Sequence, residues 1–387
     1  MMSFAPEVKS QPVARVKRIG SAGVVEVVIE VAPTSTGDDL VSQFASLTTN
    51  ARQALIAQGL GPTNVVAGWI HFAEAPRWNW RQALAAAWDV TGPLPLTAVL
   101  QPPAQPFCRC TMQLHAMHTA RQSGVWYGNS QSPAAATVLR SGARHLRLMS
   151  VLPRPDVRGT DVADLAYDMY AQARHALTDR GLAFSDVVRT WIYVRDIARN
   201  YAAFEQGRSR FFGERGLGRL PASTCVEGAP VDAAAPMAMD LYAVAAHPDV
   251  DISTVAPDPT GQAGTDGLAF LSAVRVAEPG HRTLYVSGAA APAGPDGRGD
   301  VVALTDLEGQ LDGVFRQVRF LLDRSEMRFA DVLAAKAYLK DARDYPVFRE
   351  AARSHGLGDD VPTTVVVANL GRPACLCEIE LWVSRIP

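Results

Sequence analysis

One pattern of polar and apolar positions occurs three times in this chain. Each copy has a polar turn residue, then an aliphatic pair that begins with valine, then an apolar stretch of strand length. The copies are residues 61–72, 183–194 and 328–339. Their turn residues, Asn64, Asp186 and Asp331, fall in one column, 122 and 145 residues apart. This spacing is too long for a solenoid unit, so the pattern predicts a small domain that is present three times.

The segments around each copy repeat as well. Apolar residues recur at helical spacing before each apolar stretch, which predicts a helix there. These three helical faces consist of Leu40, Phe44, Leu47, Ala51 and Leu55; of Val162, Leu165, Met169, Ala173 and Leu177; and of Leu307, Leu311, Val314, Val318 and Leu321. A second, aromatic-bearing helix is predicted after the apolar stretch, as in residues 201–212 and 345–355.

Each copy is predicted to close with two strands. A proline, at Pro95, Pro221 or Pro362, leads into the first of them. The last strands are predicted at residues 110–116, 239–245 and 377–382. The order in each copy is therefore β-hairpin, helix, strand, helix, strand, strand, which predicts an α+β fold with helices on one side of a mixed sheet.

The length of 387 residues has room for three such domains. We expect a loose tail at residues 1–12, then domains at residues 13–120, 121–250 and 251–387. Residues 118–142 and 247–267 are rich in small and polar residues and are interpreted as connectors. A Gly-Pro-Asp-Gly-Arg-Gly segment at residues 294–299 is interpreted as a hairpin tip.

Composition narrows the class of protein. With 48% hydrophobic and 20% charged residues the chain is typical of a folded soluble protein. A net charge of −2 gives no reason to expect nucleic acid or an anionic membrane as a partner. We found no long apolar run and no secretion signal. The odd number of five cysteines then favours free thiols and a cytoplasmic location.

The common catalytic and metal-binding motifs are absent: there is no phosphate loop, HExxH, GxSxG or CxxC. Two CxC pairs, Cys108 with Cys110 and Cys375 with Cys377, could hold a metal or form a redox pair. We favour the interpretation that they are small buried hydrophobes. The sequence therefore predicts no metal site and no cofactor. Trp69 and Trp191 share a column, which indicates core or inter-copy packing.

The pattern resembles the Rid (YjgF) superfamily. The clearest signatures are residues 186–191, 204, 211–212 and 220–227, and the ending at residues 372–380 looks like the close of the chorismatases. Those are Rid-like hydrolases that remove pyruvate from chorismate in secondary metabolism. The resemblance implies chorismate-mutase-like domains that form trimers with ligand sites between neighbouring subunits. With three domains on one chain, we expect an intramolecular pseudo-trimer and a monomer or weak dimer.

The chain departs from the family at several positions. Deaminating Rid proteins hold the substrate carboxylate with an arginine just after a Pro-Ala pair, and here the matching residues are Thr97, Ser223 and Thr364. None of these can form a bidentate ion pair, which argues against imine or enamine deamination. The chorismatase Tyr-Gly and Ser-Arg motif matches residues 266–267 and 271–272, so its tyrosine and arginine are missing.

Two carboxylates are the candidate catalytic groups. Glu378 and Glu380 share one face of the last strand, because side chains alternate along a strand. We match them with Asp240 and Tyr242 in the second copy, and with Thr111 and Gln113 in the first. The resemblance implies that the first of these positions donates a proton or positions a water molecule, as in the related enzymes. Burial would raise the pKa of Glu378 and let it protonate a leaving enol oxygen or an enamine carbon. The alternative is a solvated pair on an edge strand.

Four residues are candidates for substrate binding: Arg372, Lys336, Arg189 and Tyr338. Arg372 could hold a carboxylate through its planar guanidinium, unless it is a surface arginine. Lys336 replaces tryptophan in the repeated column and is one of only four lysines. It would face an inter-copy junction, where it could attract an anion or pair with a neighbouring acid. Arg189 and Tyr338 lie on equivalent strands.

These features together predict a cofactor-independent tailoring hydrolase or lyase that acts on a small cyclic carboxylate or enol ether. One working cleft is expected, between the last strand of the third copy and a neighbouring copy. Two alternatives remain open at this point. One is a Rid-type imine or enamine deaminase, and the other is a non-catalytic protein that binds a small molecule.

Overall fold

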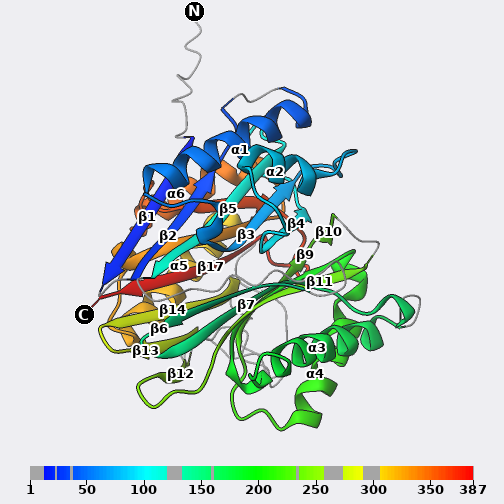
Figure 1. The fold of residues 1–387 in the computed structure, drawn as a ribbon. Coiled ribbons are helices and arrows are strands. Elements are labelled where there is room, and N and C mark those ends of the chain that lie inside the picture. The colour runs from blue at the N-terminus through cyan, green and yellow to red at the C-terminus, as the bar shows by residue number, and fades with distance from the viewer. Residues whose placement is uncertain are drawn as a thin grey trace, which may run out of the picture.

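The computed structural model describes residues 13–21, 24–34, 38–119, 133–157, 161–231, 235–256, 273–290 and 306–386. These residues form three β-sheets with helices packed against them (Figure 1). Three features of the sequence analysis lie outside the described residues: the tail at 1–12, the hairpin tip at 294–299, and the motif at 266–267 and 271–272.

Repeat 1 holds the strands β1 to β5. It comprises β1 (Ala14–Ser21), β2 (Val24–Val31), α1 (Leu40–Ala57), β3 (Val65–Phe72), α2 (Trp80–Trp88), β4 (Leu96–Leu100) and β5 (Cys110–Thr119). Its sheet has the order β1-β2-β5-β3-β4, and β10 of the next repeat is added at the β4 edge. β3 and β4 are parallel, whereas the other pairs are antiparallel.

Repeat 2 has the same topology. It comprises β6 (Ala134–Arg140), β7 (Ala143–Val151), α3 (Val162–Thr178), β8 (Val187–Val194), α4 (Ile197–Arg215), β9 (Ala222–Glu227), β10 (Ala229–Pro230) and β11 (Met237–Val244). The sheet order β6-β7-β11-β8-β9 matches that of repeat 1.

Repeat 3 follows the same order with one extra strand at its edge. It comprises β12 (Asp251–Val255), β13 (Ala273–Glu278), β14 (His281–Ala290), α5 (Leu307–Arg324), β15 (Val332–Leu339), α6 (Tyr345–Ser354), β16 (Thr363–Val367) and β17 (Cys377–Arg385). The sheet order is β12-β13-β14-β17-β15-β16. The α+β class and the predicted order of elements are therefore confirmed.

Both predicted connectors contain a strand. Residues 134–140 form β6 and residues 251–255 form β12. In β6, Ala135, Ala136 and Val138 are buried. Alanine is small but apolar, so an alanine-rich stretch can supply the buried face of a strand, and counting it as loop composition was wrong here.

The repeated turn column has a simple structural cause. The side chains of Asn64, Asp186 and Asp331 each accept a hydrogen bond from the backbone N–H three residues earlier, at 2.9, 2.8 and 3.0 Å. This bond closes a short 3₁₀ turn just before β3, β8 and β15. Asparagine and aspartate recur there because their short side chains can reach back to their own backbone.

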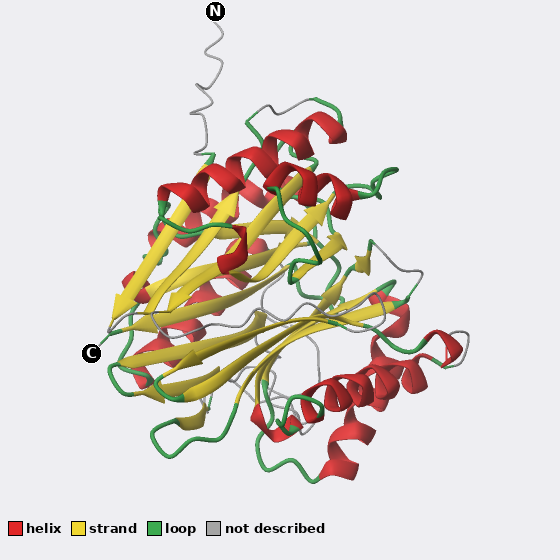
Figure 2. Cartoon of the chain, viewed as in Figure 1, coloured by secondary structure: helices red, strands yellow, loops and turns green. Residues whose placement is uncertain are grey.

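The three sheets meet in the interior and the helices lie outside (Figure 2). A buried apolar cluster fills the space between sheet and helices in each repeat. A further cluster contains residues of all three repeats, including Trp69, Trp191, Tyr285 and Trp382. The chain therefore forms an intramolecular pseudo-trimer around a shared core. Among the described residues, no helix has the length and apolar character needed to cross a membrane.

Candidate active site

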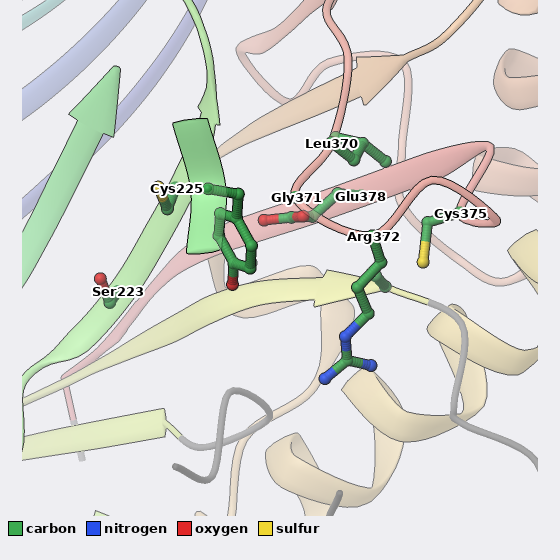
Figure 3. Close-up of a pocket in the computed structure, with 10 residues that line it drawn as sticks. Ser223, Cys225, Leu370, Gly371, Arg372, Cys375 and Glu378 are labelled. Atoms are coloured by element: carbon green, nitrogen blue, oxygen red, sulfur yellow. The ribbon is translucent and has the colours of Figure 1, made fainter. Parts of the chain in front are cut away.

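A pocket that is open to solvent lies where repeats 2 and 3 meet, and we call it the Glu378 pocket (Figure 3). Repeat 2 contributes Tyr201 from α4, and Ser223 and Cys225 from β9. Repeat 3 contributes the rest of the lining, which consists of Gly288, Ala290, Leu370, Gly371, Arg372, Cys375 and Glu378. The backbone N–H of Ser223 donates to Ser287 Oγ at 3.1 Å, which joins the two repeats beside the pocket.

Glu378 comes from β17, the central strand of the sheet in repeat 3. Its neighbours across the sheet are Ala290 on β14 and Tyr338 on β15. The ladder between β14 and β17 is irregular between Val286 and Ala289, and Gly288 lies in this bulge. A Cβ atom on Gly288 would come within 1.8 Å of Glu378 Oε1. Glycine at this position therefore makes room for the carboxyl group.

Burial raises the pKa of the Glu378 carboxyl from its ordinary value of 4.5 to about 8. The negative charge of Glu380 adds to this effect, while Arg189 and Arg372 oppose it. Burial has the largest effect because a carboxylate loses hydration when it leaves water. At neutral pH the carboxyl is mostly protonated, so it can donate a proton to a molecule in the pocket.

Arg372 lies in the loop between β16 and β17. Among the described residues it forms no ion pair and no side-chain hydrogen bond, and Figure 3 shows its guanidinium apart from the Glu378 carboxyl. The loop itself is fixed by Gln310, whose side chain donates to the carbonyl of Ala374 at 3.0 Å and accepts from the N–H of Leu376 at 2.7 Å. A fixed loop thus presents a guanidinium that is free to bind a carboxylate.

The thiols in the pocket have little nucleophilic character. Burial raises the pKa of Cys375 to about 11, and it raises that of Cys225 well above its ordinary value. A thiol with such a pKa stays protonated at neutral pH, whereas the thiolate is the reactive form. All five cysteines are buried and unpaired, in line with the interpretation of the CxC pairs as small hydrophobes.

Glu380 does not line the Glu378 pocket. Its Oε2 accepts from Arg189 Nη2 at 2.6 Å and its Oε1 accepts from Trp191 Nε1 at 2.8 Å. Both oxygens of this buried carboxylate are therefore occupied by repeat 2. Its catalytic role stays a prediction from sequence, and in the structure it acts on Glu378 through its charge.

The remaining predicted residues lie where all three repeats meet. Lys336 and Arg189 line a second pocket, which we call the central pocket, together with Glu380. Tyr338 is fully buried on β15 and lines neither of these two pockets. The structure thus brings Glu378 and Arg372 together and separates them from Lys336, Arg189 and Glu380.

The strand register corrects one match made from the sequence. Asp240 is paired with Trp191 in repeat 2, just as Glu380 is paired with Lys336 in repeat 3. Asp240 is therefore the counterpart of Glu380 and not of Glu378, and the position of Glu378 is occupied by Ala238. In repeat 1 the matches hold, because Gln113 is paired with Trp69.

Two pocket residues carried no clear signal in the sequence. Tyr201 appeared only as one aromatic residue of a predicted helix. Its ring packs so closely on Gly371 that a Cβ atom added there would lie 2.5 Å from it. Gly288 was a small residue in an apolar run, and a glycine inside a predicted strand is the signal that could have indicated a bulge.

Comparison with known proteins agrees with this architecture. The family model described as endoribonuclease L-PSP matches residues 153–245 and 270–384, which is more than half of the chain. The chain therefore belongs to this family, which is also known as YjgF/Rid. No match was found among the curated proteins.

Solved structures with the same fold include a chorismatase. It is 17% identical, with a TM-score of 0.60, over 84% of this chain and 94% of the chorismatase. A YjgF-family protein from Mycobacterium tuberculosis is 20% identical, with a TM-score of 0.26, over 34% of this chain and 98% of that protein. The E. coli TdcF structure with bound serine is 19% identical, with a TM-score of 0.26, over 31% of this chain and 98% of that protein. At this identity the chorismatase match shows the shared fold.

Proposed function

We propose that this protein is a hydrolase or lyase that acts on a small cyclic carboxylate or enol ether, with Glu378 as the proton donor. The observation that carries the proposal is a carboxyl with a pKa of about 8 in an open pocket between two repeats. The fold shared with a chorismatase makes chorismate the first substrate to test.

The chemistry requires only a proton and water. Cleavage of an enol ether is acid-catalysed, so a neutral Glu378 could protonate the leaving oxygen or the double-bond carbon. Water then supplies the hydroxyl group of the product, and the ionised Glu378 regains a proton from solvent. No resident cofactor enters these steps.

Arg372 is proposed to hold the substrate carboxylate. It lines the pocket, and no carboxylate among the described residues neutralises it. A guanidinium can form two parallel hydrogen bonds to a carboxylate, which would orient the substrate toward Glu378. Arg189 is proposed as a positioning residue, because it holds Glu380 and lowers the pKa of Glu378.

The test is release of pyruvate from chorismate, followed with a coupled lactate dehydrogenase assay. We expect Glu378→Gln to lower kcat at least 100-fold, because the amide cannot donate a proton of comparable acidity. Arg372→Gln should raise KM about 10-fold or more with a smaller change in kcat. The matched controls are Glu350→Gln and Arg343→Gln, which change exposed residues outside the pocket.

The outcomes separate the three candidate functions. Turnover of another enol ether but not of chorismate would keep the reaction class and change the substrate. Turnover of imines or enamines alone would favour the deaminase, although Ser223 occupies the place of the family arginine. Ligand binding that is equal in the wild type and Glu378→Gln, with no product in either, would favour a non-catalytic binding protein.

A further inference from the structure

The same hydrogen bond between a tryptophan and an acid joins the repeats at two of their three junctions and is missing from the third. Trp69 of repeat 1 donates its Nε1–H to Asp240 of repeat 2 at 2.8 Å. In the same way Trp191 of repeat 2 donates to Glu380 of repeat 3 at 2.8 Å. The two indole rings also pack together, with centroids 5.1 Å apart. Each junction therefore pairs a strand tryptophan with an acid of the next repeat.

The third junction has neither partner. Lys336 takes the place of the tryptophan in repeat 3, and Gln113 takes the place of the acid in repeat 1. Lys336 is only 2% exposed, and its Nζ lies 3.8 Å from the centroid of the Trp69 ring. Among the described residues Nζ has no hydrogen-bond partner. An ammonium group so deeply buried is costly unless something accepts its hydrogen bonds.

The nearby carboxylates already accept hydrogen bonds from other donors. Both oxygens of Glu380 are held by Arg189 and Trp191. Asp240 accepts from Trp69 through Oδ2, and through Oδ1 it accepts from Thr97 at 2.5 Å and from the N–H of Ser150 at 2.7 Å. The acids at the centre are therefore already occupied by donors of their own.

Two more residues that line this pocket carry buried donors without a partner. Arg189 Nη1 and Trp382 Nε1 are buried and have no partner in the described part of the chain. Their residues are 1% and 8% exposed, and both line the central pocket together with Lys336. Three residues with unpartnered N–H groups thus line one small pocket. A guest that only accepts hydrogen bonds would satisfy all three.

We propose that the central pocket binds a small anion, such as chloride, nitrate or formate, held by Lys336, Arg189 and Trp382. The anion would complete the third junction, where repeat 1 lacks the acid that the other two junctions have. A site built from an ammonium, a guanidinium and an indole N–H offers positive charge and hydrogen-bond donors. The proposal concerns a site separate from the Glu378 pocket and does not depend on its activity.

The site should weaken at high pH. Burial lowers the pKa of Lys336 to about 8, while Glu380 and Asp240 oppose this and Arg189 adds to it. Burial, and then the charge of Lys336, lower the pKa of His71 well below its ordinary value, so this histidine is neutral. A bound anion would favour the charged lysine, so affinity should fall as the pH rises above about 8.

The experiment compares unfolding temperatures in sodium nitrate, chloride and formate with those in sodium gluconate at equal ionic strength. Gluconate is too large for the pocket and controls for general salt effects. We expect a saturable rise of about 2–4 °C in the small anions only. Lys336→Met, which is unbranched and only one atom shorter but removes the charge, should abolish that difference. Lys17→Met changes a surface lysine on β1 and should preserve it.

A second variant keeps the proposal testable if Lys336→Met does not fold. Trp382→Phe removes a single N–H donor from the pocket and keeps an aromatic ring, so it should weaken the anion effect several-fold without removing it. A midpoint that follows ionic strength alone, equal in gluconate and nitrate, would show that the pocket holds only water. The proposal also fails if Lys336→Met retains the full anion dependence.

Discussion

Replacing Glu378 by glutamine should change how the stability of the protein depends on pH. Because the folded state raises the pKa of this carboxyl from 4.5 to about 8, the folded protein binds the proton more tightly than the unfolded chain does. The resulting stability is fully present below pH 4.5 and is lost as the pH rises through about 8. Glutamine keeps the shape of the protonated group and does not titrate.

The size of the effect follows from the same values. The gap between 4.5 and about 8, at about 1.4 kcal/mol per pH unit, sets an upper limit of about 5 kcal/mol. Glu378 is partly exposed at the pocket, so water can lessen the cost of ionising it. We therefore expect Glu378→Gln to be about as stable as the wild type at pH 5, and about 2–3 kcal/mol more stable at pH 9.

The assay is urea unfolding of both proteins at pH 5, 7 and 9, with Glu350→Gln as the exposed control. Every other titrating group is shared, so the difference between the two curves reports on Glu378 alone. If the difference in unfolding free energy is the same at pH 5 and pH 9, the carboxyl is not held protonated and the reasoning about the pocket is wrong.

Three further predictions concern single contacts. Gly288→Ala places a methyl group against Glu378 Oε1, so activity should fall at least 10-fold while circular dichroism is unchanged; full activity would contradict the packing described. Trp191→Phe removes the hydrogen bond to Glu380 and should lower the free energy of unfolding by about 1.5–3 kcal/mol in urea titrations. Asp186→Ala removes the hydrogen bond that closes the turn before β8 and should lower the free energy of unfolding by about 1 kcal/mol in the same titrations. Asp186→Asn can keep this bond and should be close to the wild type in stability.

The order of elements could be predicted because it depends on local periods. Helical faces repeat every 3.6 residues and strand faces every two, and both are visible in one sequence. The column of Asn64, Asp186 and Asp331 was equally local, since each side chain bonds to a backbone group three residues away. The threefold recurrence then reinforced each assignment.

The register of the last strands could not be predicted in the same way. A shift by two residues leaves the alternation of faces unchanged, so Asp240 could be matched with either Glu378 or Glu380. Only the pairing across the sheet, Trp191 with Asp240, decides between them. The domain boundaries at residues 120 and 250 remain predictions for a related reason, because the linking composition also occurs inside β6 and β12.

The pocket itself depends on contacts between segments distant in sequence. Tyr201 and Gly371 lie 170 residues apart in the chain and pack together only after repeats 2 and 3 associate. Likewise, the sequence placed Glu378 and Glu380 on one face, but which neighbour each one meets is decided by repeat 2. Arg189 and Trp191 occupy Glu380 and leave Glu378 facing the pocket.

The proposed chemistry depends on a protonated Glu378, and infrared difference spectroscopy can detect that proton. Spectra of the wild type recorded from pH 4 to pH 10 are compared with those of Glu378→Gln, and the carboxyl band that the variant lacks is followed. We expect this band to disappear with a midpoint near pH 8. A midpoint near the ordinary value of 4.5 would contradict it, and the proposed proton donor would be lost.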